Sequence, residues 1–76
     1  YQMKLYKFNN LSIDEKLAYT GSNGIFLDNY VVHDILINYY VIDKFIVEII
    51  YNTECQSITE IKCMKPDLIQ EKIILH

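Results

Sequence analysis

The stretch that decides the fold runs from Ile35 to Tyr51 and reads ILINYYVIDKFIVEIIY. It contains two runs of β-branched and aromatic residues, 35–42 and 45–51, separated by the polar pair Asp43-Lys44. Such runs favour β-strands, and two polar residues between them are typical of a hairpin turn. The turn lacks the glycine that tight hairpins prefer, so a longer or bulged connection stays open. We therefore predict an antiparallel hairpin at the centre of the fold.

Downstream of the hairpin, the sequence predicts a third strand and then a helix. The run Ser57–Met64 follows a polar loop, Asn52–Gln56, of a length that commonly joins neighbouring strands. Pro66 suits the first position of a helix, where its missing amide hydrogen costs nothing. The residues after it form an apolar stripe opposite a polar face, and the stripe comprises Leu68, Ile69, Ile73 and Leu75. We expect a three-stranded antiparallel meander followed by a C-terminal amphipathic helix.

Upstream of the hairpin, the clearest signal is the start of a helix. Ser12 and Glu15 have the spacing of a capping box, in which each side chain accepts a hydrogen bond from the other residue's amide. We predict a short helix over residues 13–20 that Gly21 ends through a left-handed conformation. We interpret residues 3–8 as extended chain or a short edge strand. The apolar residues 25–27 are compatible with either a further helical turn or the start of a strand.

Length and composition limit the class of protein. Because 76 residues leave room for one core, residues 1–76 are predicted to form a single α+β domain. Acidic residues outnumber basic ones by 10 to 7, and every basic residue is a lysine. Phosphate contacts need basic charge and most often arginine, so we expect no nucleic-acid partner. No apolar run approaches the length of a membrane span and no signal segment opens the chain, which favours a cytoplasmic protein without membrane contact.

Few residues could carry metal or nucleophilic chemistry. Cys55 and Cys63 are too sparse for a disulfide scaffold and lack zinc-binding spacing, so we expect free thiols, with a bridge as the alternative. His33-Asp34 is similar to a doublet in metal-dependent phosphohydrolases, but the other histidine is the terminal His76 and such sites need further ligands. We therefore predict no metal, no cofactor and no Cys-His nucleophile.

Side chains alternate across a strand, so the predicted sheet has two distinct faces. One face is the expected core, and its members are Leu36, Asn38, Tyr40, Ile42, Phe45, Val47, Ile49, Tyr51, Thr59, Ile61 and Cys63. The second face is too apolar for a plain solvated surface, although charged residues are set within it. We expect this face to be an interface, with candidate residues Ile37, Tyr39, Ile46, Glu48, Ile50, Ile58 and Glu60.

Two registers are possible for Glu48 on the second face. The simple register sets Glu48 opposite Glu60, which is unfavourable for like charges. A shift of two residues sets Glu48 opposite Lys62 instead and predicts an ordinary ion pair. The first register would leave two carboxylates that could act as acid and base with Tyr39 or Lys62, if a dimer completed the site.

One further pattern resembles a known group of proteins. The run from Tyr40 to Asn52, the segment 58–62 and the tetrapeptide Gly24-Ile25-Phe26-Leu27 are similar to small bacterial proteins that have no assigned function. These proteins share a short amphipathic helix, a Gly-Phe-Leu-like segment and a hairpin ending in an FxVExxY-like strand. The resemblance covers about residues 8–68. It implies the α+β meander and transfers no catalytic residue.

Three functions are compatible with these features. Our preferred hypothesis is a non-catalytic interaction module that forms a homodimer, either by burying the second face or by pairing a strand edge. One alternative is an acidic inhibitor or immunity-type protein that covers a basic partner, which a net charge of -3 permits. The other is a small enzyme with a carboxylate site at Glu48 and Glu60, completed across the dimer.

Overall fold

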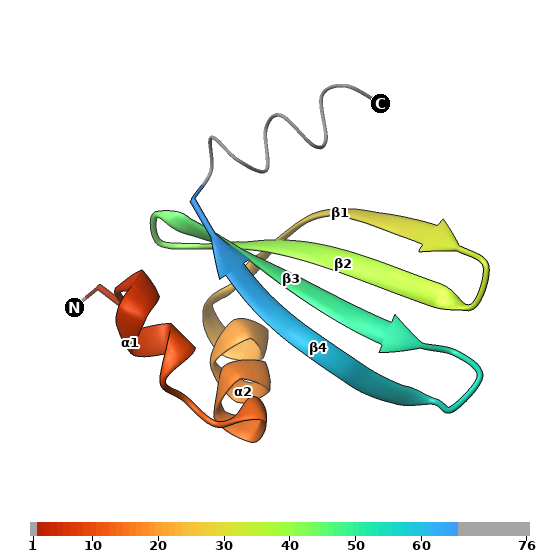
Figure 1. Ribbon diagram of the computed structural model, residues 1–76. Coiled ribbons are helices and arrows are strands. Elements are labelled where there is room, and N and C mark those ends of the chain that lie inside the picture. Colours follow the sequence, from red (N-terminus) through yellow and green to blue (C-terminus); the bar gives the residue numbers. More distant parts are fainter. Residues whose placement is uncertain (1, 66–76) are drawn as a thin grey trace.

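The computed structural model describes residues 2–65, and Figure 1 shows how their elements are arranged. Two helices come first, and four strands follow: α1 (Leu5–Asn9), α2 (Ile13–Asn23), β1 (Ile25–Val32), β2 (Ile35–Ile42), β3 (Phe45–Asn52) and β4 (Ser57–Met64). The strands form one antiparallel sheet in the order β1-β2-β3-β4, so each strand pairs with its neighbour in sequence. The chain is α+β, as predicted, but both helices come ahead of the sheet.

The predicted number of strands is wrong, because the sheet has four strands and not three. Residues Ile25–Val32 form a complete strand, of which the sequence indicated only the first part as one of two options. Asp28 and Asn29 obscure the strand, since both residue types are common in turns. The turn itself is His33-Asp34, with His33 in the left-handed region at φ 54°, and it lacks the usual Asn-Gly signature. The predicted C-terminal helix from Pro66 lies outside the described residues.

Residues 3–8 contain α1 and not the extended segment that we expected. A helix of 5 residues has little stability of its own in water, so its packing must supply the stability. Phe8 provides that packing, since its side chain is 0% exposed and its ring centroid lies 5.3 Å from that of Phe45 and 6.4 Å from that of Tyr19. The residues ahead of the helix are held to the β2–β3 turn by a separate hydrogen bond, in which the Met3 amide donates to Asp43 Oδ2 at 2.8 Å.

Helix α2 begins as predicted and ends later. The Ser12 hydroxyl accepts from the Glu15 amide at 3.1 Å, and the Glu15 carboxylate accepts from the Ser12 amide at 2.8 Å, which confirms the capping box. The predicted stop at Gly21 is wrong, because the helix continues through it and no glycine among the described residues has a positive φ. Gly24 is the C-cap instead. A Cβ there would lie 2.6 Å from the Thr20 carbonyl oxygen, so this close approach requires glycine.

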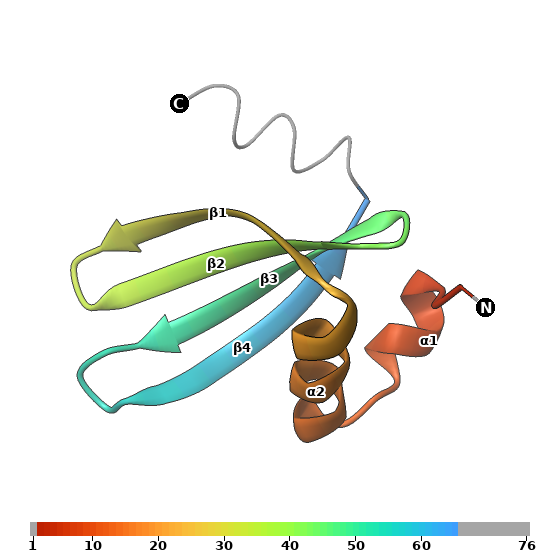
Figure 2. The same cartoon turned by 180° about the vertical axis from the view of Figure 1, so that it is seen from behind.

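Both helices pack on one face of the sheet, which we call the helical face and which carries Leu36, Asn38, Tyr40 and Ile42 on β2. The buried core on this face consists of Met3, Phe8, Ile42, Phe45, Val47 and Ile49, with residues such as Leu11 and Leu17 of the helical segment packed around it. In both views the helices lie at the end of the sheet near the β2–β3 turn, and the other two turns lie at the far end (Figures 1 and 2). The helices therefore cover only part of the helical face. We call the opposite face, with Ile37, Tyr39 and Val41 on β2, the open face.

A bulge in β4 changes which residues share a face. Ile50 pairs with Glu60 and Tyr51 pairs with Ile58, so Thr59 is an extra residue on β4. The bulge turns Ile58 toward the helical face, where it packs against the core. The prediction that Ile58 belongs to the second face is therefore wrong, since it assumed unbroken alternation along the strand. The two-residue turn at Asp43-Lys44 is confirmed by the pairing of Ile42 with Phe45.

The capping box generates a test of helix α2. Ser12→Ala removes the acceptor for the Glu15 amide and should lower the free energy of unfolding by about 1 kcal/mol. The loss is measured as a lower midpoint of urea unfolding, followed by circular dichroism. Ser22→Ala, at an exposed serine in the last turn of α2, is the matched control and should not lower the midpoint, since alanine is the better helix former. Equal losses in the two variants would contradict the role of the cap.

Candidate interaction surface

The open face collects all but one of the predicted interface residues. Tyr39 lies opposite Glu48, Ile37 lies opposite Ile50, and Ile50 in turn lies opposite Glu60. Ile46 shares this face through its contact with Tyr39. Only Ile58 is separated from the set, by the bulge in β4.

The centre of the open face is already buried within the chain. Tyr39 is 5% exposed, Ile46 is 4% exposed and Glu48 is 6% exposed. Around this cluster pack the partly buried side chains of Tyr30, Ile37, Val41 and Met64. Because its central residues have little free surface, this part of the open face offers little to a partner.

A buried hydrogen bond joins β2 to β3 across the open face. The Tyr39 hydroxyl donates to Glu48 Oε2 at 2.7 Å, and the two residues are direct cross-strand neighbours. Burial raises the pKa of Tyr39, and the hydrogen bond and negative charge of Glu48 raise it further. The Tyr30 ring packs edge-on against the Tyr39 ring, with 5.9 Å between centroids. Tyr39 is therefore an internal hydrogen-bond donor and not the exposed contact that we expected.

The register of β4 settles the partners of the charged residues. Glu48 lies opposite Lys62, which confirms the shifted register of the two that the sequence allowed. The Lys62 ammonium is nevertheless paired with Glu60, with 3.8 Å between Lys62 Nζ and Glu60 Oε2. Both side chains are about half exposed, and ion pairs at such surface positions contribute little to stability. The carboxylates of Glu48 and Glu60 thus have separate, ordinary partners. This arrangement gives no support to an acid–base site.

The exposed apolar surface lies on β1, which the sequence prediction left out of the sheet. In residues 2–65 the exposed large hydrophobic side chains are concentrated on this strand, namely Ile25 (71%), Phe26 (54%), Leu27 (45%), Val31 (71%) and Val32 (54%). The strand pairs only with β2, and within the described part of the chain no strand lies along its outer edge (Figure 1). The backbone groups on that edge are a template for another strand.

The two edges of the sheet differ in how they are protected. The outer edge of β4 carries the charged residues Glu60 and Lys62 together with the bulge at Thr59, and both devices discourage another strand from pairing. Strand β1 carries one charged residue, Asp28, and a bulge at Leu27 near its start. The five positions after the bulge, residues 28–32, pair regularly with β2. The β1 edge is therefore the less protected of the two.

The remaining candidates for chemistry are scattered. His33 lies in the β1–β2 turn, and within residues 2–65 no three His, Cys, Asp or Glu side chains gather to hold a metal ion. Cys55 is an exposed free thiol, and Cys63 is a half-buried one whose pKa is raised by burial. In this same part of the chain, no helix combines the length and apolar character that crossing a membrane requires.

Comparison of the chain with protein-family models, with curated proteins and with solved structures finds no match.

The Tyr39–Glu48 hydrogen bond generates a stability test. Tyr39→Phe leaves the buried Glu48 carboxylate without its donor and should lower the free energy of unfolding by about 1–3 kcal/mol. The measurement is denaturant unfolding at neutral pH. A second variant, Tyr39→Phe with Glu48→Met, removes both polar partners and should recover much of the loss. A double variant no more stable than the single one would show that the hydrogen bond is not the cause.

The raised pKa of Tyr39 predicts a loss of stability in alkali. Folding favours the neutral phenol, so this stabilisation is complete below about pH 10, where an unfolded tyrosine is also neutral. Above about pH 10 the unfolded tyrosine ionises and the stabilisation declines. The free energy of unfolding should therefore fall more steeply in the parent than in Tyr39→Phe, when both are unfolded by denaturant at a series of alkaline pH values. Parallel curves would contradict the assignment.

Proposed function

We propose that this chain is a non-catalytic self-association module in which β1 of one copy pairs antiparallel with β1 of a second copy. The observation that carries the proposal is the concentration of exposed apolar side chains on the less protected edge of the sheet. Pairing would join two four-stranded sheets into one continuous sheet and cover both β1 edges.

The hairpin geometry supplies the backbone groups that pairing needs. Val32 and Ile35 close a two-residue turn and so hydrogen-bond to each other, after which bonded and non-bonded positions alternate along the strand. By this alternation the amide and carbonyl groups of Asn29 and Val31 face away from β2. They are the groups that a second strand would bond, and the Asn29 amide would then exchange its local hydrogen bond to Asp28 Oδ1, at 2.8 Å, for one to the partner strand.

The pattern of β1 is self-complementary, which favours a second copy as the partner. Its sequence is IFLDNYVV, with apolar residues at both ends of the polar pair Asp28-Asn29. When Asn29 of each copy faces Asn29 of the other, Leu27 of one copy meets Val31 of the other. In this register Asp28 faces Tyr30, so the two carboxylates are not directly opposed. A two-fold axis then relates the copies, as in most homodimers.

The test compares lysine substitutions on the two edges of the sheet. Val31→Lys puts a charge at a position that is 71% exposed in the single chain, so it should prevent β1 pairing without unfolding the protein. Thr59→Lys puts the same charge at an exposed position of the β4 edge and is the matched control. Light scattering across a dilution series should give about twice the 9.0 kDa mass of one chain for the parent and the control, and one chain for Val31→Lys.

Circular dichroism of the same samples checks that both variants are folded. A parent that stays monomeric at the highest concentration, or a folded Val31→Lys variant that still dimerises, would overturn the proposal.

A further inference from the structure

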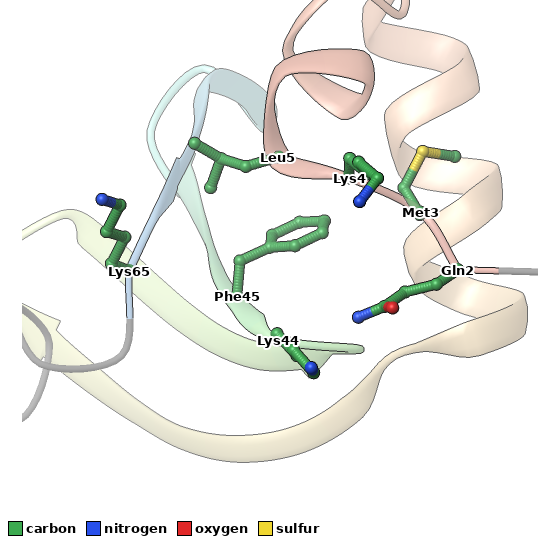
Figure 3. A pocket seen from close by; sticks show the side chains of 7 residues that line it. All are labelled: Gln2, Met3, Lys4, Leu5, Lys44, Phe45 and Lys65. Atoms are coloured by element: carbon green, nitrogen blue, oxygen red, sulfur yellow. The ribbon is translucent and has the colours of Figure 1, made fainter.

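A hollow with a cavity volume of about 230 Å³ lies where three distant parts of the chain meet. The N-terminal segment, the start of β3 and the end of the described chain line it, through Gln2, Met3, Lys4, Leu5, Lys44, Phe45 and Lys65 (Figure 3). It is separate from β1, since no residue of β1 lines it.

The floor of the hollow is apolar and fixed in position. Phe45 is 3% exposed and Met3 is 6% exposed, and both belong to the buried core under the helices. Figure 3 shows the Phe45 ring in the middle of the hollow, with Leu5 and Met3 on its far side from Lys44. A ligand that met this floor would contact side chains that are already ordered, so its binding would order little more of the chain.

The rim of the hollow is basic. Lys4, Lys44 and Lys65 are exposed, and among residues 2–65 no acidic residue lines the hollow. Asp43 is adjacent to Lys44 in sequence, but its Oδ2 accepts the Met3 amide at 2.8 Å, and so this carboxylate fastens the N-terminal segment to the β2–β3 turn. Three of the chain's few cationic side chains are thus gathered at one site of a protein whose net charge is -3.

We propose that this hollow binds a small amphipathic carboxylate. Its apolar body would lie mainly on Leu5, which is half-buried, at the margin of the Phe45 ring, and its carboxylate would meet the ammonium groups of the rim. The apolar floor favours a ligand with a hydrocarbon part over a fully hydrated inorganic ion. Lysine is a point charge without the planar fork of arginine, so the rim suits a single anionic group approached from several directions.

The experiment titrates the full chain with three probes. Hexanoate carries both the charge and the hydrocarbon part, 1-hexanol carries the hydrocarbon part alone, and inorganic phosphate carries charge alone. Binding is followed by the amide shifts of Met3, Leu5 and Phe45 in proton–nitrogen NMR spectra. Hexanoate should bind at least about five-fold more tightly than either of the other probes, since only it satisfies both the floor and the rim.

Salt and variants identify the rim as the source of the selectivity. Raising the salt from about 0.01 M to about 1 M shortens the screening length from roughly 30 Å to roughly 3 Å and should weaken hexanoate binding several-fold. Lys44→Gln with Lys65→Gln should weaken it about five-fold. Lys62→Gln removes one positive charge, where the rim variant removes two, from an exposed lysine outside the hollow and should leave hexanoate binding unchanged.

Three results would overturn the proposal. They are the absence of hexanoate shifts at these amides, equal affinity for hexanoate and either of the other probes, and equal weakening by the rim variant and by Lys62→Gln. Because the rim lysines are exposed, all variants should give the amide spectrum of the folded parent before any ligand is added.

Discussion

The burial of Phe8 against the start of β3 is the contact on which the rest of the structure depends. Phe8 is the one residue of the short helix α1 that is fully buried, and its ring contacts Phe45 of the sheet and Tyr19 of α2. Full burial of such a side chain contributes on the order of 1.5–3 kcal/mol, which is a large share of the net stability of a small domain. Both helices are therefore gathered at the end of the sheet where this contact forms.

That gathering determines which surfaces remain free. Two short helices around one point cannot cover four strands of 8 residues each. The part of the sheet that they leave uncovered includes the edge strand β1. The same packing brings Phe45 to the margin of the core, where the N-terminal segment and the end of β4 meet around it. The apolar edge and the lysine-rimmed hollow are thus two consequences of one limited core.

The Tyr39–Glu48 pair has a different part in the fold. A buried hydrogen bond of this kind adds little net stability compared with apolar residues of the same shape, but breaking it leaves a carboxylate buried without its partner. Tyr39 and Glu48 face each other only in the register that also pairs Ile42 with Phe45. Sliding β2 against β3 would separate the donor from the carboxylate, so the pair disfavours other registers.

The sequence by itself determined the features that depend on neighbouring residues. The hairpin at Asp43-Lys44 and the capping box of Ser12 follow from local pattern, because turn chemistry and amide capping act over a few residues. The open face was also largely predictable, since side chains alternate along any regular strand. That pattern could not reveal how deeply Tyr39 and Glu48 are buried.

Only the tertiary structure decided the elements whose stability comes from distant contacts. Helix α1 forms because Phe8 packs against Phe45. Strand β1 forms because it pairs with β2, although Asp28 and Asn29 are residue types typical of turns. The bulge at Thr59 turns Ile58 to the helical face, where its apolar side chain packs against the core. Local preferences in these segments are weak or contrary, and the free energy of packing outweighs them.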